Sequence, residues 1–278
     1  MKLITDSTAD LPSELVERYN IEIVPLKIHL GEETYMDYYG IAPDEFYRLL
    51  RSTELFPTTT QPSPQDFVEV YRRLAEEDNC LISVHISSKL SGTYQSAMIA
   101  RQQFPDIKIH VVDSRQASLG LGMIVLAAAK AIEAGEGVDR VLSLIGRLSQ
   151  KIRTYFSVDS LEYLHRGGRI GRAQAFLGTM MRIKPLLELR DGEVYPVERI
   201  RGQQRLVRRM AQLVRDAAEA GALKVGLICT DNEEVFSMLS QQLAQIGNLE
   251  LEYIGKVGGI ITSHVGPGAI GVSYYPAL

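Results

Sequence analysis

The sequence contains no tryptophan and only two cysteines, Cys80 and Cys229, among 278 residues. Neither cysteine has the spacing of a zinc site or a disulfide framework, and both adjoin apolar runs, so we expect small buried side chains. An excess of one charge is also missing, because 30 basic and 34 acidic residues leave a formal net charge of −4. A general nucleic-acid-binding protein needs a strong positive field. We therefore expect no nucleic-acid partner.

Long apolar runs are absent as well. The longest uncharged apolar run, 119–129, is well below the ~20 residues needed to cross a bilayer, and Lys2 stands too early for the apolar core of a signal peptide. With 45% hydrophobic and 23% charged residues, a chain of this length can bury a sizeable core without disulfides. The composition predicts a globular protein of the cytoplasm.

In the first half, short β-like runs alternate with amphipathic helical stretches, which is the pattern of a parallel α/β sheet. We expect strands at 2–5, 21–27, 81–86, 107–112 and 154–158. We expect helices after Pro12, after Pro43, from the capping box at Ser63–Asp66, and over 94–103, 118–134 and 138–150. The predicted N-terminal α/β domain, residues 1–157, has a mostly parallel open sheet with flanking helices.

The second half has a different pattern. Asp191-Gly192 between two extended runs predicts a tight type I′ hairpin and hence antiparallel pairing. A basic helix over 199–215, a strand at 225–229 and a strand at 257–261 are expected to follow. Residues 158–278 are therefore predicted to form a C-terminal α/β domain with a mixed sheet, and the fold class is α/β with two domains.

Several polar segments stand at expected strand ends, where ligands gather in open α/β sheets. They are Thr5–Asp10, Pro57–Ser63, Ile86–Thr93 and Val112–Arg115. Hydroxyl and backbone N–H groups near helix starts can bind a carboxylate or a phosphate, although each hydroxyl could also simply cap a helix. The most specific segment is Ser91-Gly92-Thr93, because Gly92 lets the backbone approach a ligand closely.

The sequence contains no convincing motif for binding a cofactor or a metal. Gly266–Gly271 fits G-x-G-x-x-G, but only seven residues follow it, too few for a dinucleotide fold. Walker A, G-x-S-x-G and zinc spacings are missing from the sequence. We therefore expect no cofactor and no metal. The arginine- and glycine-rich stretch 165–172 is either a solvated loop or a loop that binds an anion or a partner, and His264 is expected in a glycine-rich turn.

Taken together, these segments resemble the DegV family. The matching segments are Asp6–Leu11, Pro57–Ser63, Leu90–Ser96, Val112–Arg115 with Gly120, Leu161–Ile170 and Ser263–Gly271. The likeness runs in order from the first residues to the last. It implies a two-domain α/β protein that binds one long-chain fatty acid in a buried tunnel. The runs 119–129 and 176–183 are candidates for the tunnel walls, with ordinary core as the alternative.

The resemblance also implies site residues and a partner. The carboxylate is held by Ser91 and Gly92 of Leu-Ser-Gly-Thr, by Thr59 or Thr60, and by His264 near the head group. Many relatives carry Thr-Ser-Gln where this chain has Thr60-Gln61, so the two threonines remain alternatives. Arg166 matches an arginine implicated in binding an ATP-dependent kinase subunit, which phosphorylates the acid for phospholipid synthesis. The chain would not be catalytic alone, and lipid exchange could involve transient membrane contact.

Two other functions remain open at this point. A self-sufficient phosphotransferase would use His264 or Ser91 as nucleophile and would turn over ATP without a partner. A lipid-sensing regulatory module would form a lipid-dependent complex without phosphoryl transfer. The basic helix 199–215 favours that module, unless it is simply a solvated charged face.

Overall fold

The computed structural model describes residues 1–178 and 183–277, which form three sheets. The first sheet is fully parallel, in the order β2-β1-β6-β7. Its strands are β1 (Lys2–Asp6), β2 (Glu22–Val24), β6 (Cys80–His85) and β7 (Lys108–Asp113). Its helices are α1 (Ser13–Arg18), α3 (Pro64–Ala75) and α4 (Thr93–Arg101), with the short 3-10 turn η1 (Ser7–Ala9) after β1. The capping box at Ser63 and Asp66 starts α3, as the sequence predicts.

The second sheet has six strands in the order β10-β9-β8-β13-β11-β12, and only β11 and β12 run parallel. Its strands are β8 (Arg153–Ser157), β9 (Ile183–Arg190), β10 (Glu193–Arg201), β11 (Leu223–Cys229), β12 (Leu249–Lys256) and β13 (Ile270–Pro276). Its helices and turns are α7 (Glu162–Arg166), η2 (Gly171–Phe176), α8 (Gln203–Ala218), α9 (Glu233–Leu243) and α10 (Gly259–Val265). Asp191 and Gly192 both have positive φ, 51° and 82°, as a type I′ turn requires.

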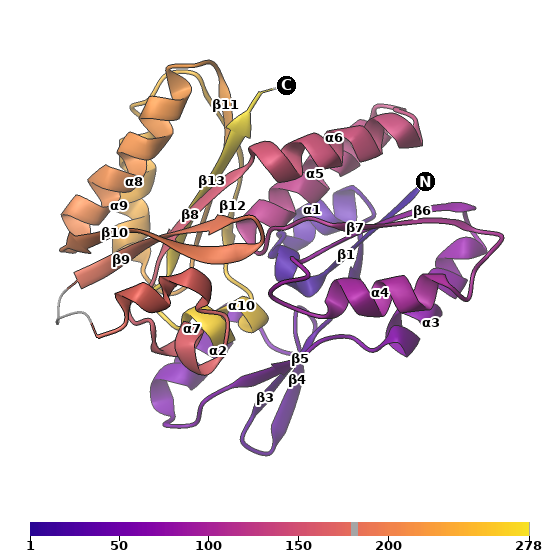
Figure 1. Ribbon diagram of the computed structural model, residues 1–278, viewed down its shortest axis with the longest axis horizontal. Coiled ribbons are helices and arrows are strands. Elements are labelled where there is room, and N and C mark those ends of the chain that lie inside the picture. The colour runs from indigo at the N-terminus through magenta and orange to yellow at the C-terminus, as the bar shows by residue number, and fades with distance from the viewer. Residues whose placement is uncertain (179–182, 278) are drawn as a thin grey trace.

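These sheets are two layers of a larger stack (Figure 1). Helices α3 and α4 cover one face of the parallel sheet, and α8 and α9 cover the far face of the mixed sheet. Helices α5 (Leu119–Glu133) and α6 (Val138–Lys151) lie between the sheets. Nearly every residue of α5 from 119 to 129 is buried, because a helix that is apolar on all sides needs a surrounding core. In the described part of the chain, no helix combines the length and apolar character needed to cross a membrane.

A small third sheet lies below the other two in the view of Figure 1, in the order β4-β3-β5. It comprises β3 (Lys27–Leu30), β4 (Glu33–Met36) and β5 (Thr58–Thr60), with α2 (Pro43–Ser52) beside it. The expected strand 21–27 is therefore two strands in two sheets, because Pro25 lacks an N–H and interrupts the ladder. Thr58–Thr60 forms an edge strand where we expected only a loop.

Two other expectations about strands were wrong. The strand expected at 154–158 pairs with β9 and β13 in the mixed sheet rather than extending the parallel one, so a boundary after residue 157 would separate β8 from its neighbours. The segment expected as a strand at 257–261 becomes helix α10. Its β-branched residues suggested a strand, but side chains of Asp10 and Asp37 accept the N–H groups of Gly258 and Gly259 and start a helix.

Candidate functional site

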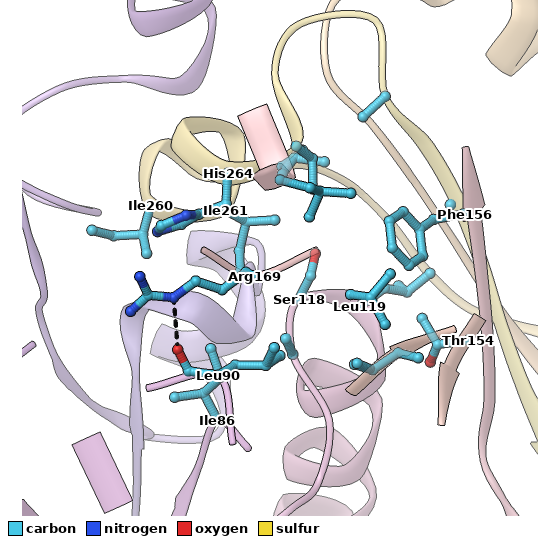
Figure 2. Close-up of a pocket in the computed structure, with 18 of the residues that line it drawn as sticks. Ile86, Leu90, Ser118, Leu119, Thr154, Phe156, Arg169, Ile260, Ile261 and His264 are labelled. Carbon is cyan, nitrogen blue, oxygen red and sulfur yellow. Dashed lines mark hydrogen bonds between the residues drawn. The ribbon is translucent and has the colours of Figure 1, made fainter. Parts of the chain in front are cut away.

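A cavity lies between α10, the loop after β6, the start of α5 and the inner face of the mixed sheet. Its lining is mostly aliphatic, with Phe156 as its aromatic member: Leu26, Ile86, Leu90, Leu119, Phe156, Leu164, Leu189, Val194, Ile228, Ile260, Ile261, Val265 and Ile270 contribute. Polar groups are few, and Figure 2 shows where they lie. Arg169 and His264 are at one end and Thr154 and Phe156 at the other. The cavity is thus mostly apolar, and Arg169 lies together with His264 at one end, called the polar end below.

The polar end joins segments that are far apart in the sequence. Thr59 Oγ1 of β5 lies 2.9 Å from His264 Nε2 of α10. Ser91 Oγ lies 2.9 Å from Thr93 Oγ1 at the start of α4 and accepts the Thr93 N–H at 3.3 Å. Thr59, Ser91 and His264 all line the cavity. The structure therefore brings together three of the residues predicted for the carboxylate site.

His264 is neutral at this end of the cavity. Burial, together with the nearby charge of Arg169, lowers the pKa of His264 to about 4. Its Nδ1 atom is buried and has no hydrogen-bond partner among the described residues. A neutral imidazole that binds Thr59 Oγ1 through Nε2 positions the threonine hydroxyl at the cavity. The positive charge at this end comes instead from the guanidinium of Arg169.

Arg169 is held in place by the backbone around it. Its Nε donates to the Leu90 carbonyl at 3.0 Å and its Nη1 to the Gly167 carbonyl at 2.7 Å. A guanidinium has further N–H groups to offer, and Arg169 lines the cavity beside His264. We expected the stretch 165–172 to be a solvated loop or a loop for an anion or partner. The structure shows two different environments within this stretch: Arg169 lines the cavity, whereas Arg166 is exposed to solvent.

The other predicted residues lie around this end. Gly92 starts α4, and a Cβ there would collide with the side chain of Gln61, so glycine is what allows Gln61 to lie beside Ser91. Thr60 lies outside the cavity lining, and its Oγ1 is 2.8 Å from His29 Nε2 on the exposed side of β5. Period-2 alternation along β5 turns the two threonines to opposite faces. Thr59 is thus the threonine at the cavity.

Arg166 ends α7 with its side chain 52% exposed. Its Nη1 lies 3.1 Å from Glu162 Oε1, and its guanidinium lies over the Phe56 ring at 4.1 Å from the centroid. Helix α7 packs against α10, which carries His264. An exposed arginine and a cavity-lining arginine are therefore only three residues apart.

Sequence reasoning missed several lining residues. Gln61, Ser118, Thr154 and Arg169 line the cavity but were not predicted for the site. Arg169 lay within a stretch that was singled out, whereas Thr154 carried no local signal, because β8 reaches the cavity only through sheet pairing. Of the two suggested tunnel walls, 119–129 contributes Leu119. In the other, 176–183, the described residues 176–178 and 183 do not line the cavity, and 179–182 lie outside the described residues.

This arrangement fits an amphiphilic anion. Hydroxyls, a fixed guanidinium and a neutral histidine can satisfy a carboxylate, which is costly to bury without hydrogen bonds. The aliphatic remainder can take a hydrocarbon chain. Within residues 1–178 and 183–277, no group of three His, Cys, Asp or Glu side chains is placed to hold a metal ion.

Comparisons with known proteins point to one family. The model of a family described as uncharacterised proteins, DegV family, matches residues 1–277. A DegV domain-containing protein of Caldanaerobacter subterraneus is 37% identical over 273 residues, which is 98% of this chain and 97% of the relative.

Solved structures show the same likeness. A DegV family protein from Thermus thermophilus, whose structure is described as fatty acid binding, has a TM-score of 0.95 and 41% identity, with 99% of each chain covered. DegV of Bacillus subtilis, described as a fatty acid binding protein, has a TM-score of 0.90 and 30% identity, with 99% of each chain covered.

Proposed function

The chain belongs to the DegV family, and we propose that it binds one long-chain fatty acid in the cavity, with the carboxylate at Thr59, Ser91, Arg169 and His264. One observation supports this most: at the polar end of a mostly aliphatic cavity, the guanidinium of Arg169 is held by backbone carbonyls and lies beside a neutral His264. Each buried methylene contributes about 0.8 kcal/mol, so the hydrocarbon chain supplies most of the affinity. The polar end then sets the orientation of the acid.

The proposal extends to what happens to the bound acid. We infer that in the cytoplasm the protein presents the carboxylate to a separate ATP-dependent kinase subunit, and that the acyl-phosphate enters phospholipid synthesis. Arg166 supports this inference, because it is exposed close to the polar end and lies over Phe56 at 4.1 Å. A guanidinium with free N–H groups can pair with acidic or phosphate groups of a partner. In this proposal Arg166 contacts the kinase subunit, and Arg169 contacts the carboxylate of the fatty acid.

The carboxylate site can be tested with Ser91→Ala. Removing one donor to a charged group costs about 1.5–3 kcal/mol, so we expect the affinity for oleate to fall roughly 10- to 150-fold. Thr93 loses only a neutral hydrogen bond, and the fold should persist. The measurement is a calorimetric titration of the delipidated protein. An unchanged dissociation constant would instead assign Ser91 to supporting the start of α4.

The kinase step gives a second prediction. Mixing the protein with ATP, Mg²⁺ and oleate should give acyl-phosphate only after the kinase subunit is added. Arg166→Ala should lower that rate at least several-fold while leaving oleate affinity unchanged. Arg140→Ala is the matched control, because Arg140 is also exposed and pairs with a glutamate four residues earlier, Glu136, at 2.9 Å. Acyl-phosphate formed by the isolated protein would favour a self-sufficient phosphotransferase.

A further inference from the structure

The start of α10 is held by two buried carboxylates that the proposed binding site does not use. Asp10 Oδ1 accepts the N–H of Gly258 at 2.9 Å, and Asp37 Oδ1 accepts the N–H of Gly259 at 3.0 Å. The side chains of this carboxylate pair, Asp10 and Asp37, come from residues that are 7% and 2% exposed. A Cβ at Gly258 would lie 2.6 Å from Asp10 Oδ1, so glycine is what allows this close approach.

The carboxylate pair acts on both sides of the acyl cavity. Helix α10 contributes Ile260, Ile261, His264 and Val265 to the lining. Asp10 Oδ2 accepts the hydroxyl of Ser118, which lines the cavity where α5 begins. Glycines flank α10, with Gly258 before it and Gly266, at a φ of 74°, after it. Glycines at both ends can serve as hinges for a movement of α10, which also packs against α2, α7, β3, β5 and η1.

Within residues 1–178 and 183–277, neither carboxylate has a compensating cation. Among the described residues, no lysine, arginine or histidine forms an ion pair with Asp10 or Asp37, and Asp37 Oδ2 has no hydrogen-bond partner. Burial raises the pKa of Asp37 to about 6, although nearby N–H groups, including that of Gly259, oppose this shift. Burial, and to a lesser extent the charge of Asp37, also raises the pKa of Asp10 well above its ordinary value.

Asp10 and Asp37 are the groups proposed to change protonation in this part of the structure, and other titratable groups face them. The titratable and charged groups that face this pair from the packed elements are Asp6, Glu14, Tyr38, Tyr47, Cys229, Glu233, Tyr253 and Lys256. Burial raises the pKa values of Tyr47 and Tyr253 further above neutrality, and that of Cys229 to about 11. Lys256 pairs with Asp44 on α2.

We propose that Asp10 and Asp37 form a proton-sensitive clasp on α10, which controls how often the acyl cavity opens to exchange its fatty acid. The inference rests on the proposed fatty-acid binding. In the closed state Asp37 is buried and binds its proton more tightly than in an open, hydrated state. Low pH therefore favours the closed state. The opening equilibrium therefore rises as pH increases from about 4 to about 6 and is level above that. Over this range the rise is up to about 100-fold, since each unit of pKa difference is tenfold.

Asp37→Asn tests the proposal, because the amide keeps the acceptor oxygen without the buried charge. Asp10→Asn is a second variant, and asparagine suits the left-handed backbone of residue 10, whose φ is 49°. Glu32→Gln, in the exposed turn before β4, is the matched control. The probe is cis-parinaric acid, displaced by excess oleate in a stopped-flow fluorimeter between pH 4.5 and 8. The dissociation constant of each variant is measured in parallel.

At pH 7.5 we expect Asp37→Asn to slow association and dissociation alike, by about 10- to 100-fold, with an unchanged dissociation constant. The difference from the unmodified protein should shrink to about fourfold near pH 4.5, and Glu32→Gln should behave like the unmodified protein at every pH. Equal or faster dissociation from Asp37→Asn at pH 7.5 would overturn the clasp, leaving the pair as a static cap of α10. If no variant took up acid at all, the proposed function itself would fail, and the clasp with it.

Discussion

Replacing Asp6 by alanine is expected to lower the free energy of unfolding by about 4 kcal/mol. Asp6 is fully buried and accepts four hydrogen bonds at the end of β1. Two come from Thr8, through its N–H at 3.1 Å and its hydroxyl. The others come from the Ile86 N–H at 3.0 Å and from His85 Nδ1 at 2.9 Å. The alanine variant leaves all four donors buried without this acceptor.

The Asp6 network continues into the core of the parallel sheet. The Tyr71 hydroxyl donates to Ser83 Oγ at 2.9 Å, and Ser83 Oγ lies 2.6 Å from His85 Nε2. Since Ser83 can donate to Nε2, Nδ1–H is free to donate to Asp6. This Ser–His–Asp series is completely buried and lies outside the cavity lining. We therefore assign it to stability rather than to catalysis.

Urea unfolding followed by circular dichroism measures this effect. The matched control is Asp113→Ala, because Asp113 ends the strand β7 of the same sheet and also accepts three hydrogen bonds, from Ser88 and Arg115. Asp113 is only partly buried, so water can replace its oxygens and the loss should stay below about 2 kcal/mol. Equal losses at the two positions would contradict the account of the Asp6 network.

Arg169→Ala should weaken fatty-acid binding strongly. The bound carboxylate would lose its cation in a half-buried site, and removing one member of such a pair costs about 2–5 kcal/mol. We expect the dissociation constant for oleate to rise at least 30-fold, about 2 kcal/mol. Displacement of cis-parinaric acid from the delipidated protein measures it.

Two variants isolate the charge of Arg169. Arg169→Lys keeps a cation but loses the planar guanidinium, so it should recover only part of the affinity. Arg172→Ala removes a neighbouring arginine that is 67% exposed and lies 3.7 Å from Glu193 Oε2, and it should bind oleate as the unmodified protein does. If Arg172→Ala and Arg169→Ala weakened binding equally, the long-range positive charge of this stretch would explain the effect, and a direct contact with the carboxylate would not.

Local patterns predicted much of the fold. The Asp191-Gly192 turn, the capping box before α3 and the apolar run of α5 each depend on neighbouring residues, and the structure confirms them. The α/β class with a parallel and a mixed sheet is confirmed as well. The helix α10 could not be predicted this way, because Asp10 and Asp37, which hold its start, are more than two hundred residues away in the sequence.

The candidate site shows the same limit. Thr59 and Thr60 were indistinguishable until Thr58–Thr60 was known to be a strand, whose alternation turns one threonine to the cavity and the other to His29. Arg166 and Arg169 belong to one glycine-rich stretch, and Gly168, at a φ of 71°, helps to reverse the chain between them. Thr154 reaches the cavity only because β8 pairs with β13.

The most direct test of the central claim is the lipid content of the purified protein. We predict that extraction with organic solvent and mass spectrometry will recover close to one long-chain fatty acid per protein molecule, and that the delipidated protein will take up the same amount of oleate. Protein that is free of fatty acid after purification, and that also fails to take up oleate or palmitate, would contradict the account.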